Sequence, residues 1–364
     1  MKKRRGILNK ILSAAAVIAL TFNTGTVAAF AAAKTEAAPE VLTVQNSVNY
    51  AVTNSNSLKK AEEDNYIARE NHETLLWSFH SAVTEEEHIK AAIALTRNEV
   101  QTALAYPEIA NQKKSLELTI TRYFETILSA ERSLELYDEK LELDKKDLEI
   151  TKVKAELGMV SKSALDSAQL AYDKAVINRD SKVKAIDDAY RTLRQTMGVS
   201  ETKKYKVALK FTYKPFTEGN LDGYINDAYV TNLQIMTLTE NYNLAKYEHD
   251  MTSFASLFEE ESSVLKLNQQ LRSIEEAKTK LRDTIKTYYE DILSAEQNYD
   301  LALVDIAAME KQLEIKKTQL ELGKITQIEV DKYEYEILNA QNSLEDIIAN
   351  HEMTVLQFVN TELL

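Results

Sequence analysis

Side chains that could do chemistry are few and widely spaced in this sequence. His80 and His88 lie eight positions apart and could share one face of a helix. The chain has no cysteine, and no third ligand follows close by. It also has no HExxH pair, no G-x-S-x-G and no glycine-rich phosphate loop. We therefore expect no metal site, no cofactor and no enzymatic activity, and an exported hydrolase would lack a residue set to carry its reaction. The five histidines are His72, His80, His88, His249 and His351.

The strongest candidate site is a pair of glycine turns. Glu156-Leu157-Gly158 recurs as Glu321-Leu322-Gly323, and the segment YFETILSAE at 123–131 recurs as YYEDILSAE at 288–296. Self-similarity at one fixed spacing, here 165 residues, indicates an internal duplication. The candidate site residues are Gly158, Met159, Val160, Ser161 and Asp166 in the first copy, and Gly323, Lys324, Ile325, Thr326 and Asp331 in the second.

Two interpretations of these turns stay open. Glycine ends a helix at positive φ without steric cost, and Ser161 or Thr326 can cap the next helix. The order Thr326-Gln327-Ile328-Glu329 also fits a capping box. In this interpretation the residues simply make a stable hairpin. In the other, the same turns form a surface at which a partner docks.

The elements that must position these turns are long helices. The chain has only 7 glycines and 3 prolines in 364 residues, and such a scarcity of turn residues predicts an all-α fold of long antiparallel hairpins. We expect helices over about 42–73, 81–106, 109–157, 161–197, 221–251, 262–322 and 327–360. Pro107 should break or kink its helix, Gly198 should cap one, and residues 205–215 should form a short strand or extended connector.

Apolar residues in the helices before the turns recur every seven positions, which indicates coiled-coil packing. Two rows occur on each helix, about 200° apart at ~100° per residue. Two seams suit a helix in a wall with a neighbour on each flank, although a plain bundle helix with a wide apolar face stays an alternative. In the first copy the rows are Leu134, Leu141 and Leu148, and Leu136, Leu143, Ile150 and Leu157. In the second they are Ile306, Leu313 and Leu320, and Leu301, Ala308, Ile315 and Leu322.

The N-terminal residues read as a targeting segment. A basic start, an apolar core at 11–22 and small residues at 29–33 predict a signal peptide over 1–33, with an uncleaved anchor as the alternative. A disordered lead-in at 34–41, a helical repeat at 42–200, a connector at 201–220 and a second repeat at 221–364 should follow. The net charge of −13 argues against nucleic acid or an anionic membrane as a partner.

This arrangement resembles the TolC family of outer-membrane efflux proteins. In that family an L-G-x-[IV]-[ST] segment with a following acid marks each hairpin tip, and residues 157–161 with Asp166 and 322–326 with Asp331 match it. The opening helices resemble each other as well, because AVTN at 51–54 recurs as YVTN at 229–232. The resemblance implies a homo-trimer whose tips dock a membrane-fusion (adaptor) protein, and an inner-membrane transporter that supplies the energy for efflux or type I-like secretion.

The sequence departs from the family in one place. Family members insert two membrane strands per repeat, whereas residues 77–107 read as helix and 252–261 are too few for two spanning strands. We therefore expect a shortened relative in the cell envelope, exported and extracytoplasmic or wall-associated rather than inserted in an outer membrane. The alternative function is a coiled-coil spacer or binding rod of the cell surface without a transport role.

Overall fold

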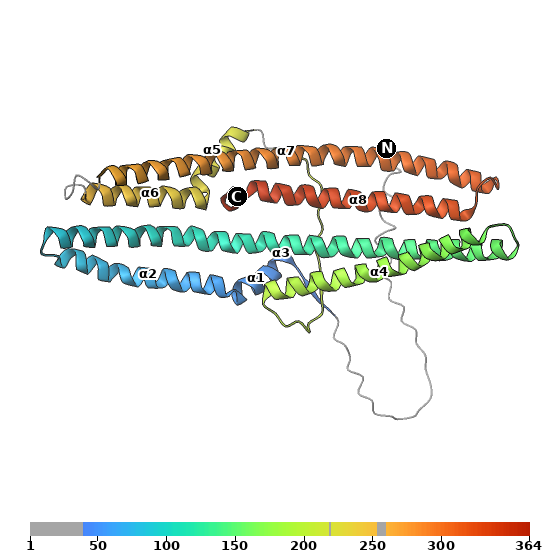
Figure 1. The fold of residues 1–364 in the computed structure, drawn as a ribbon, viewed down its shortest axis with the longest axis horizontal. Helices are drawn as coiled ribbons and strands as arrows, with labels where there is room; N and C mark the ends of the chain where they lie inside the picture. Colours follow the sequence, from blue (N-terminus) through green and yellow to red (C-terminus); the bar gives the residue numbers. More distant parts are fainter. Residues whose placement is uncertain (1–38, 218–219, 253–259) are drawn as a thin grey trace, which may run out of the picture. The chain divides into compact units, whose positions relative to one another are not determined.

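The computed structural model describes residues 39–217, 220–252 and 260–364 of the chain. The predicted signal peptide and residues 34–38 of the lead-in lie outside this part. Within it the fold is all-α, as the scarcity of glycine and proline predicts, with eight α-helices (Figure 1). The first four are α1 (Val44–Asn54), α2 (Asn56–Ser81), α3 (Glu85–Glu156) and α4 (Lys162–Met197); the others are α5 (Leu221–Thr231), α6 (Leu233–Thr252), α7 (Glu260–Glu321) and α8 (Gln327–Val359).

Each repeat opens with two helices where the sequence predicted one. The expected helix 42–73 is interrupted at Ser55, whose hydroxyl accepts from the Leu58 N–H at 3.3 Å. The expected helix 221–251 is interrupted at Asn232, whose side-chain oxygen accepts from the Ile235 N–H at 3.1 Å. In both places a polar side chain satisfies an amide that the new helix leaves without a partner. Each of these two predictions of one continuous helix is therefore wrong.

Of the break or kink predicted at Pro107, the break is wrong, because α3 runs through this residue in a helix of 72 residues. Proline removes one backbone hydrogen bond and costs about 3 kcal/mol in a helix interior. Tertiary contacts on both sides offset this cost. The Asn98 amide donates to the Ala68 carbonyl of α2 at 2.9 Å, and the Asn111 amide donates to the Glu362 carbonyl at 3.0 Å.

A two-stranded sheet ties the start of the first repeat to the connector. Strand β1 (Glu40–Leu42) pairs in parallel with β2 (Tyr205–Val207), with Leu42 opposite Val207. Glu40 and Val41 are exposed but pair with Tyr205 and Lys206 in this sheet, so the prediction of disorder is wrong for these two residues. The strand at 205–207 agrees with the alternating pattern that predicted an extended connector at 205–215.

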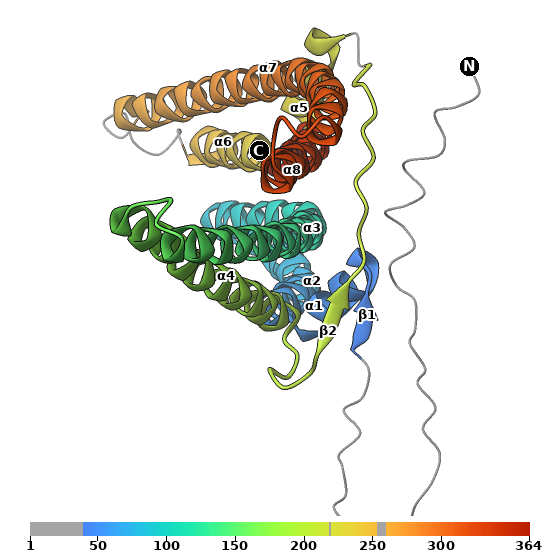
Figure 2. The ribbon, with the colours of Figure 1, turned by 90° about the vertical axis from the view of Figure 1, so that its right-hand side faces the viewer.

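The long helices lie in a row in the order α7, α8, α3, α4, which Figure 2 shows nearly end-on. Two ion pairs identify the neighbours of α3. Arg179 of α4 donates to Asp138 at 2.7 Å, and Arg132 donates to Asp346 of α8 at 2.5 Å. Helix α3 thus packs on both flanks, as its two heptad rows predict for a helix in a wall. Leu136 and Leu143 of one row and Leu148 of the other are buried.

Each repeat has a core of its own near the middle of the long helices. The first is built around Phe124, Ile127 and Leu193, together with both strands. The second is built around Ile285, Ile292 and Phe358. Ile127 and Ile292 belong to the duplicated segments 123–131 and 288–296, so the duplication is a duplication of core positions. These cores hold the helices whose far ends carry the glycine turns.

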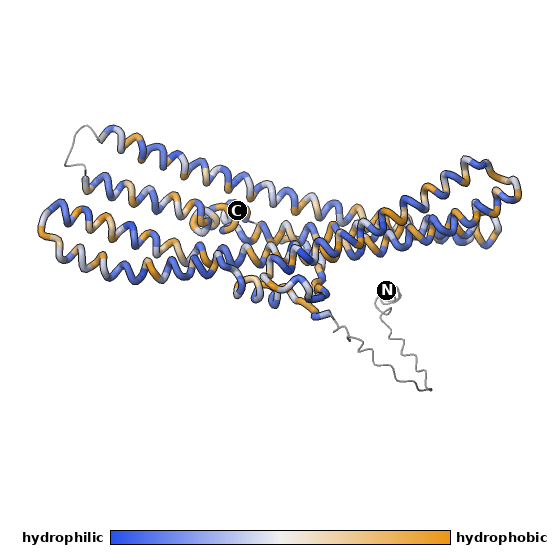
Figure 3. Tube along the Cα trace, turned by 60° about the horizontal axis from the view of Figure 1, so that its bottom comes forward, coloured by the Kyte–Doolittle hydropathy of each residue, from blue (hydrophilic) through white to orange (hydrophobic). Residues whose placement is uncertain are grey.

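Apolar and hydrophilic residues alternate along all of the long helices (Figure 3). This is the expected pattern for helices that bury narrow stripes and expose the rest. Among the described residues, no helix has an apolar stretch long enough to cross a membrane.

Candidate functional site

The two predicted tips have the same backbone geometry. At the first, Gly158 takes φ +70°, its N–H donates to the Ala155 carbonyl at 3.0 Å, and the Met159 N–H donates to the Lys154 carbonyl at 2.8 Å. This pair of bonds is a Schellman motif, which satisfies the last carbonyls of α3.

The second tip repeats the motif at the end of α7. Gly323 takes φ +65°, its N–H donates to Leu320 at 2.8 Å, and the Lys324 N–H donates to Gln319 at 2.9 Å. The requirement for glycine lies in the backbone, because a Cβ added at Gly158 or Gly323 would meet nothing within 4 Å. No other part of the described chain therefore packs against either turn on the side to which a Cβ would point.

The helices that leave the tips are capped as the sequence predicts. The Ser161 hydroxyl accepts from the Ala164 N–H at 3.2 Å and begins α4. At the other tip Thr326 and Glu329 occupy the two positions of a capping box. The Glu329 carboxylate accepts from the Thr326 N–H at 2.7 Å and from its hydroxyl at 2.8 Å. These bonds lower the pKa of Glu329, because they favour the charged carboxylate.

Large apolar side chains surround both glycines without being covered. Leu157 is 70% exposed, Met159 69% and Leu322 64%, while Val160 and Ile325 are partly buried. Both tips lie at the same end of the long helices (Figure 1). An arrangement of exposed apolar groups on two rigid turns offers a binding surface, not a reaction centre.

The two predicted acids differ in their surroundings. Asp331 accepts from Gln327 at 2.7 Å and from Lys146 of α3 at 3.1 Å, and these donors lower its pKa. Asp166, at the same position of the first repeat, is exposed on α4. Asp331 thus belongs to a contact between helices, and only eight of the ten predicted residues belong to the turns themselves.

No family model matches the sequence, and no curated protein matches it. Solved structures do. The Campylobacter jejuni CmeC outer membrane channel superposes with a TM-score of 0.68 at 11% identity, over 88% of this chain and 85% of that one. CusC, which forms a transmembrane channel, superposes with a TM-score of 0.68 at 9% identity, over 88% of this chain and 91% of CusC. The outer membrane protein VceC of Vibrio cholerae superposes with a TM-score of 0.63 at 11% identity, over 88% of this chain and 96% of VceC.

The fold is that of the TolC-like outer membrane channels. At these low identities the likeness is one of fold. It covers 88% of this chain in all three comparisons.

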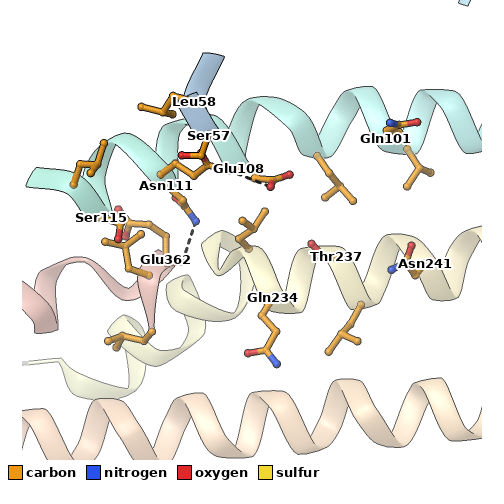
Figure 4. Close-up of a pocket in the computed structure, with 18 of the residues that line it drawn as sticks. Ser57, Leu58, Gln101, Glu108, Asn111, Ser115, Gln234, Thr237, Asn241 and Glu362 are labelled. Carbon is orange, nitrogen blue, oxygen red and sulfur yellow. Dashed lines mark hydrogen bonds between the residues drawn. The ribbon is translucent and has the colours of Figure 1, made fainter. Parts of the chain in front are cut away.

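The TolC-like fold of this chain also has a cavity of about 1060 Å³ between α3, α6 and the C-terminal residues. Figure 4 shows Asn111 of α3 donating to the Glu362 carbonyl, with Thr237 and Asn241 of α6 beside the same space. Leucines and neutral amides line most of it, and its Arg97 pairs with Glu248 at 2.6 Å.

The histidines do not gather into a site. His80 and His88 both contact the Phe79 ring, with centroids 5.7 Å away, and the described part of the chain holds no cluster of side chains suited to a metal. His351 is fully buried, with Glu296 at 3.6 Å. Glu296 also accepts from the Phe216 N–H at 2.6 Å, which fastens the connector to α7. Sequence reasoning missed this pair, because nothing in the spacing of residues 216, 296 and 351 brings them together.

Proposed function

We propose that this protein is a subunit of an efflux or type I-like secretion conduit in the cell envelope, and that its glycine tips dock an adaptor protein. The observation that supports the proposal is the TolC-like fold, to which 88% of the chain is similar. In this proposal the protein performs no chemistry. An inner-membrane transporter drives the movement of substrate, and copies of this chain, three by resemblance, form the tube.

The tip surface suits this role for a physical reason. Met159 and Leu322 expose apolar area at fixed positions, and the Schellman bonds and caps hold the backbone beneath them. Little conformational entropy is then lost when a partner covers the tips. The apolar ends of an adaptor's helical hairpin would gain from the burial of this area, at about 25 cal/mol per Å².

The proposal is tested by capture of the adaptor encoded nearest to the gene, with chemical cross-linking on cells. Replacing Gly158 and Gly323 with tryptophan fills the open space at both turns. We expect capture to fall about tenfold or more while the helical signal in circular dichroism stays normal. The matched control replaces both glycines with asparagine, which tolerates positive φ and adds little bulk, and should retain capture.

Unchanged capture by the tryptophan variant would remove the tips from the docking surface. Absence of capture by the unaltered protein would instead contradict the conduit and favour the alternative, a coiled-coil spacer or binding rod of the cell surface. Adjacent adaptor and transporter genes support the conduit, whereas adjacent wall or surface-layer genes support the rod.

A further inference from the structure

A second, smaller cavity lies between α2 and α3 and adjoins the cavity between α3 and α6. The larger cavity has a volume of about 1060 Å³ and the smaller one about 330 Å³. Four residues line both of them: Ser57 of α2, and Gln101, Glu108 and Gln112 of α3 (Figure 4). The three residues of α3 lie seven and four positions apart, which places them on one face of the helix. The two cavities therefore meet along this face.

Two side-chain oxygens at the junction of the cavities are buried without a hydrogen-bond donor in the described part of the chain. Asn65 of α2 lines the smaller cavity and is 9% exposed, and its Oδ1 accepts no hydrogen bond there. The Gln112 amide nitrogen donates to Glu108 at 3.4 Å, but the buried Oε1 of Gln112 has no donor. A buried acceptor without a donor costs about 1–3 kcal/mol. Each oxygen therefore gains free energy from a donor that enters the cavity.

The charged residues of the larger cavity leave one carboxylate without a cation. Arg97 pairs with Glu248 at 2.6 Å, and Glu362 pairs with Lys114. Glu108 belongs to neither pair, and its hydrogen bond in the described structure comes from the neutral amide of Gln112. The carboxylate of Glu108 is thus available to a cation from outside the chain.

The smaller cavity adds no net charge to that of Glu108. Lys60 and Asp64 of α2 line it, are both exposed and lie one helical turn apart, so their charges offset each other. The junction therefore combines a carboxylate with two amide oxygens that lack donors. All of these groups accept hydrogen bonds, and a carboxylate prefers a donor that carries a positive charge.

Leucines lie next to this polar junction. Leu104 of α3 and Leu238 of α6 are partly buried and line the larger cavity, and Leu58 of α2, which is 2% exposed, lines it as well. Leu104 lies one turn before Glu108, so the apolar surface begins beside the carboxylate. Among the described residues, no aromatic side chain lines either cavity. The lining therefore differs from the aromatic cages that bind quaternary ammonium groups.

We propose that the two cavities together bind an organic ammonium ion with an apolar body. Its N–H groups donate to the Glu108 carboxylate and to the side-chain oxygens of Gln112 and Asn65, and its apolar part lies on the leucines between α3 and α6. The volume suits a drug-sized molecule, because ligand pockets typically measure about 300–1,000 Å³. This site goes beyond the proposed conduit and does not depend on it, since the tips contribute nothing to it.

Calorimetric titration of the purified full chain with octylammonium tests the proposal, with two other octyl compounds for comparison. We expect one octylammonium ion to bind per chain. Octyltrimethylammonium has the same charge and the same alkyl chain but no N–H group, so it should bind about tenfold or more weakly, because the buried oxygens stay without donors. Octanoate carries the opposite charge and should not bind. Octylammonium that fails to bind, or that binds no better than either comparison compound, overturns the inference.

Two substitutions locate the bound ion. Glu108→Gln removes the carboxylate and should weaken octylammonium binding about tenfold or more. The matched control, Glu117→Gln, changes an exposed acid of α3 outside both cavities and should leave the affinity unchanged. Asn65→Leu keeps the volume but removes one acceptor, so it should weaken octylammonium binding and leave octyltrimethylammonium binding unchanged.

Circular dichroism verifies that each variant is folded. Undiminished binding by Glu108→Gln would refute the site, and an equal loss of both cations in Asn65→Leu would refute the hydrogen bond to Asn65. Adaptor capture by Glu108→Gln is a separate readout and should stay normal, so failure of the ammonium site and failure of the docking at the tips are distinguished.

Discussion

At the scale of single residues, three glycines of the described part of the chain take positive φ, and each ends a long helix: Gly158, Gly198 and Gly323. Their surroundings differ. A Cβ at Gly198 would lie 2.6 Å from the Asn54 Cβ, whereas the tip glycines face open space. All three positions therefore favour glycine because of their positive φ, and of the three only Gly198 also lacks the space for a Cβ.

This difference predicts an order of stability effects. Gly158→Ala and Gly323→Ala should each cost about 1 kcal/mol, the penalty of a left-handed conformation with a Cβ. Gly198→Ala should cost more, because Asn54 must also move. Urea denaturation of the three variants measures the order, with hydrogen exchange at the tips to detect local fraying. Equal costs at all three positions would contradict the steric part of the argument.

Asp331 predicts a pH effect at the second tip. Its pKa is lowered by Gln327 and Lys146, so its stabilising contribution is complete above the ordinary aspartate value of about 4 and is lost as the pH falls through the lowered value. Asp331→Asn should remove this part of the acid dependence, an effect of up to about 1 kcal/mol. Thermal melts between pH 3 and 6 measure it. Glu336→Gln, on the exposed side of α8, is the control and should keep the parent's profile.

At the scale of elements, an asparagine in each repeat fastens the opening helices to the end of the last one. The Asn54 amide donates to the Met197 carbonyl at 2.9 Å. The Asn232 amide donates to Thr361 and Leu364 carbonyls at 3.1 and 2.9 Å, and its oxygen caps α6. Asn54 and Asn232 are the last residues of the recurring segments 51–54 and 229–232. The two repeats therefore share this contact between their first and last helices as well as their core positions.

Removal of these two asparagine side chains should lower the free energy of unfolding by unequal amounts. Asn232→Ala deletes a cap and leaves two carbonyls without their donor at a position only 2% exposed, which should cost about 2–4 kcal/mol. Asn54→Ala deletes one partly buried bond and should cost about 1 kcal/mol. The midpoints of urea denaturation measure both. A larger loss at Asn54 would show that the bonds to the C-terminal residues contribute little.

Local signals in the sequence were sufficient for most elements. The sevenfold rows, the glycine turns and Ser161 and Thr326 predicted the long hairpins and their caps, because each signal acts within a few residues. The breaks at Ser55 and Asn232 were missed although their caps are local, because the sequence has many other serines and asparagines that could cap a helix equally well. The continuity at Pro107 was missed because the bonds on either side of it reach Ala68 and Glu362, which are distant in sequence. The same applies to the site: spacing predicted the tips, but only the structure places Asp331 against Lys146.

At the scale of the whole molecule, the duplicated chain is two similar halves joined by a connector. Strand β2 belongs to the first core, whereas Phe216 packs on the second. Between them residues 208–215 have no helix or strand. The halves also contact each other directly along α3 and α8. The connector thus links the halves covalently, and the helix contacts hold them by packing.

A chain divided within the connector, after Leu209, should therefore reassemble. Co-expressed fragments 1–209 and 210–364 should copurify in equal amounts, because α3 and α8 retain their apolar row and ion pairs. Arg132→Ala in the first fragment removes the partner of Asp346 and should weaken the association about fivefold, as for one ion pair of about 1 kcal/mol. Arg191→Ala, whose pair with Asp188 lies within α4, is the matched control and should leave the affinity unchanged. Titration of the separately purified fragments, followed by circular dichroism, measures both. Fragments that fold but stay apart would mean that the covalent connector, and not the α3–α8 contact, keeps the two halves together.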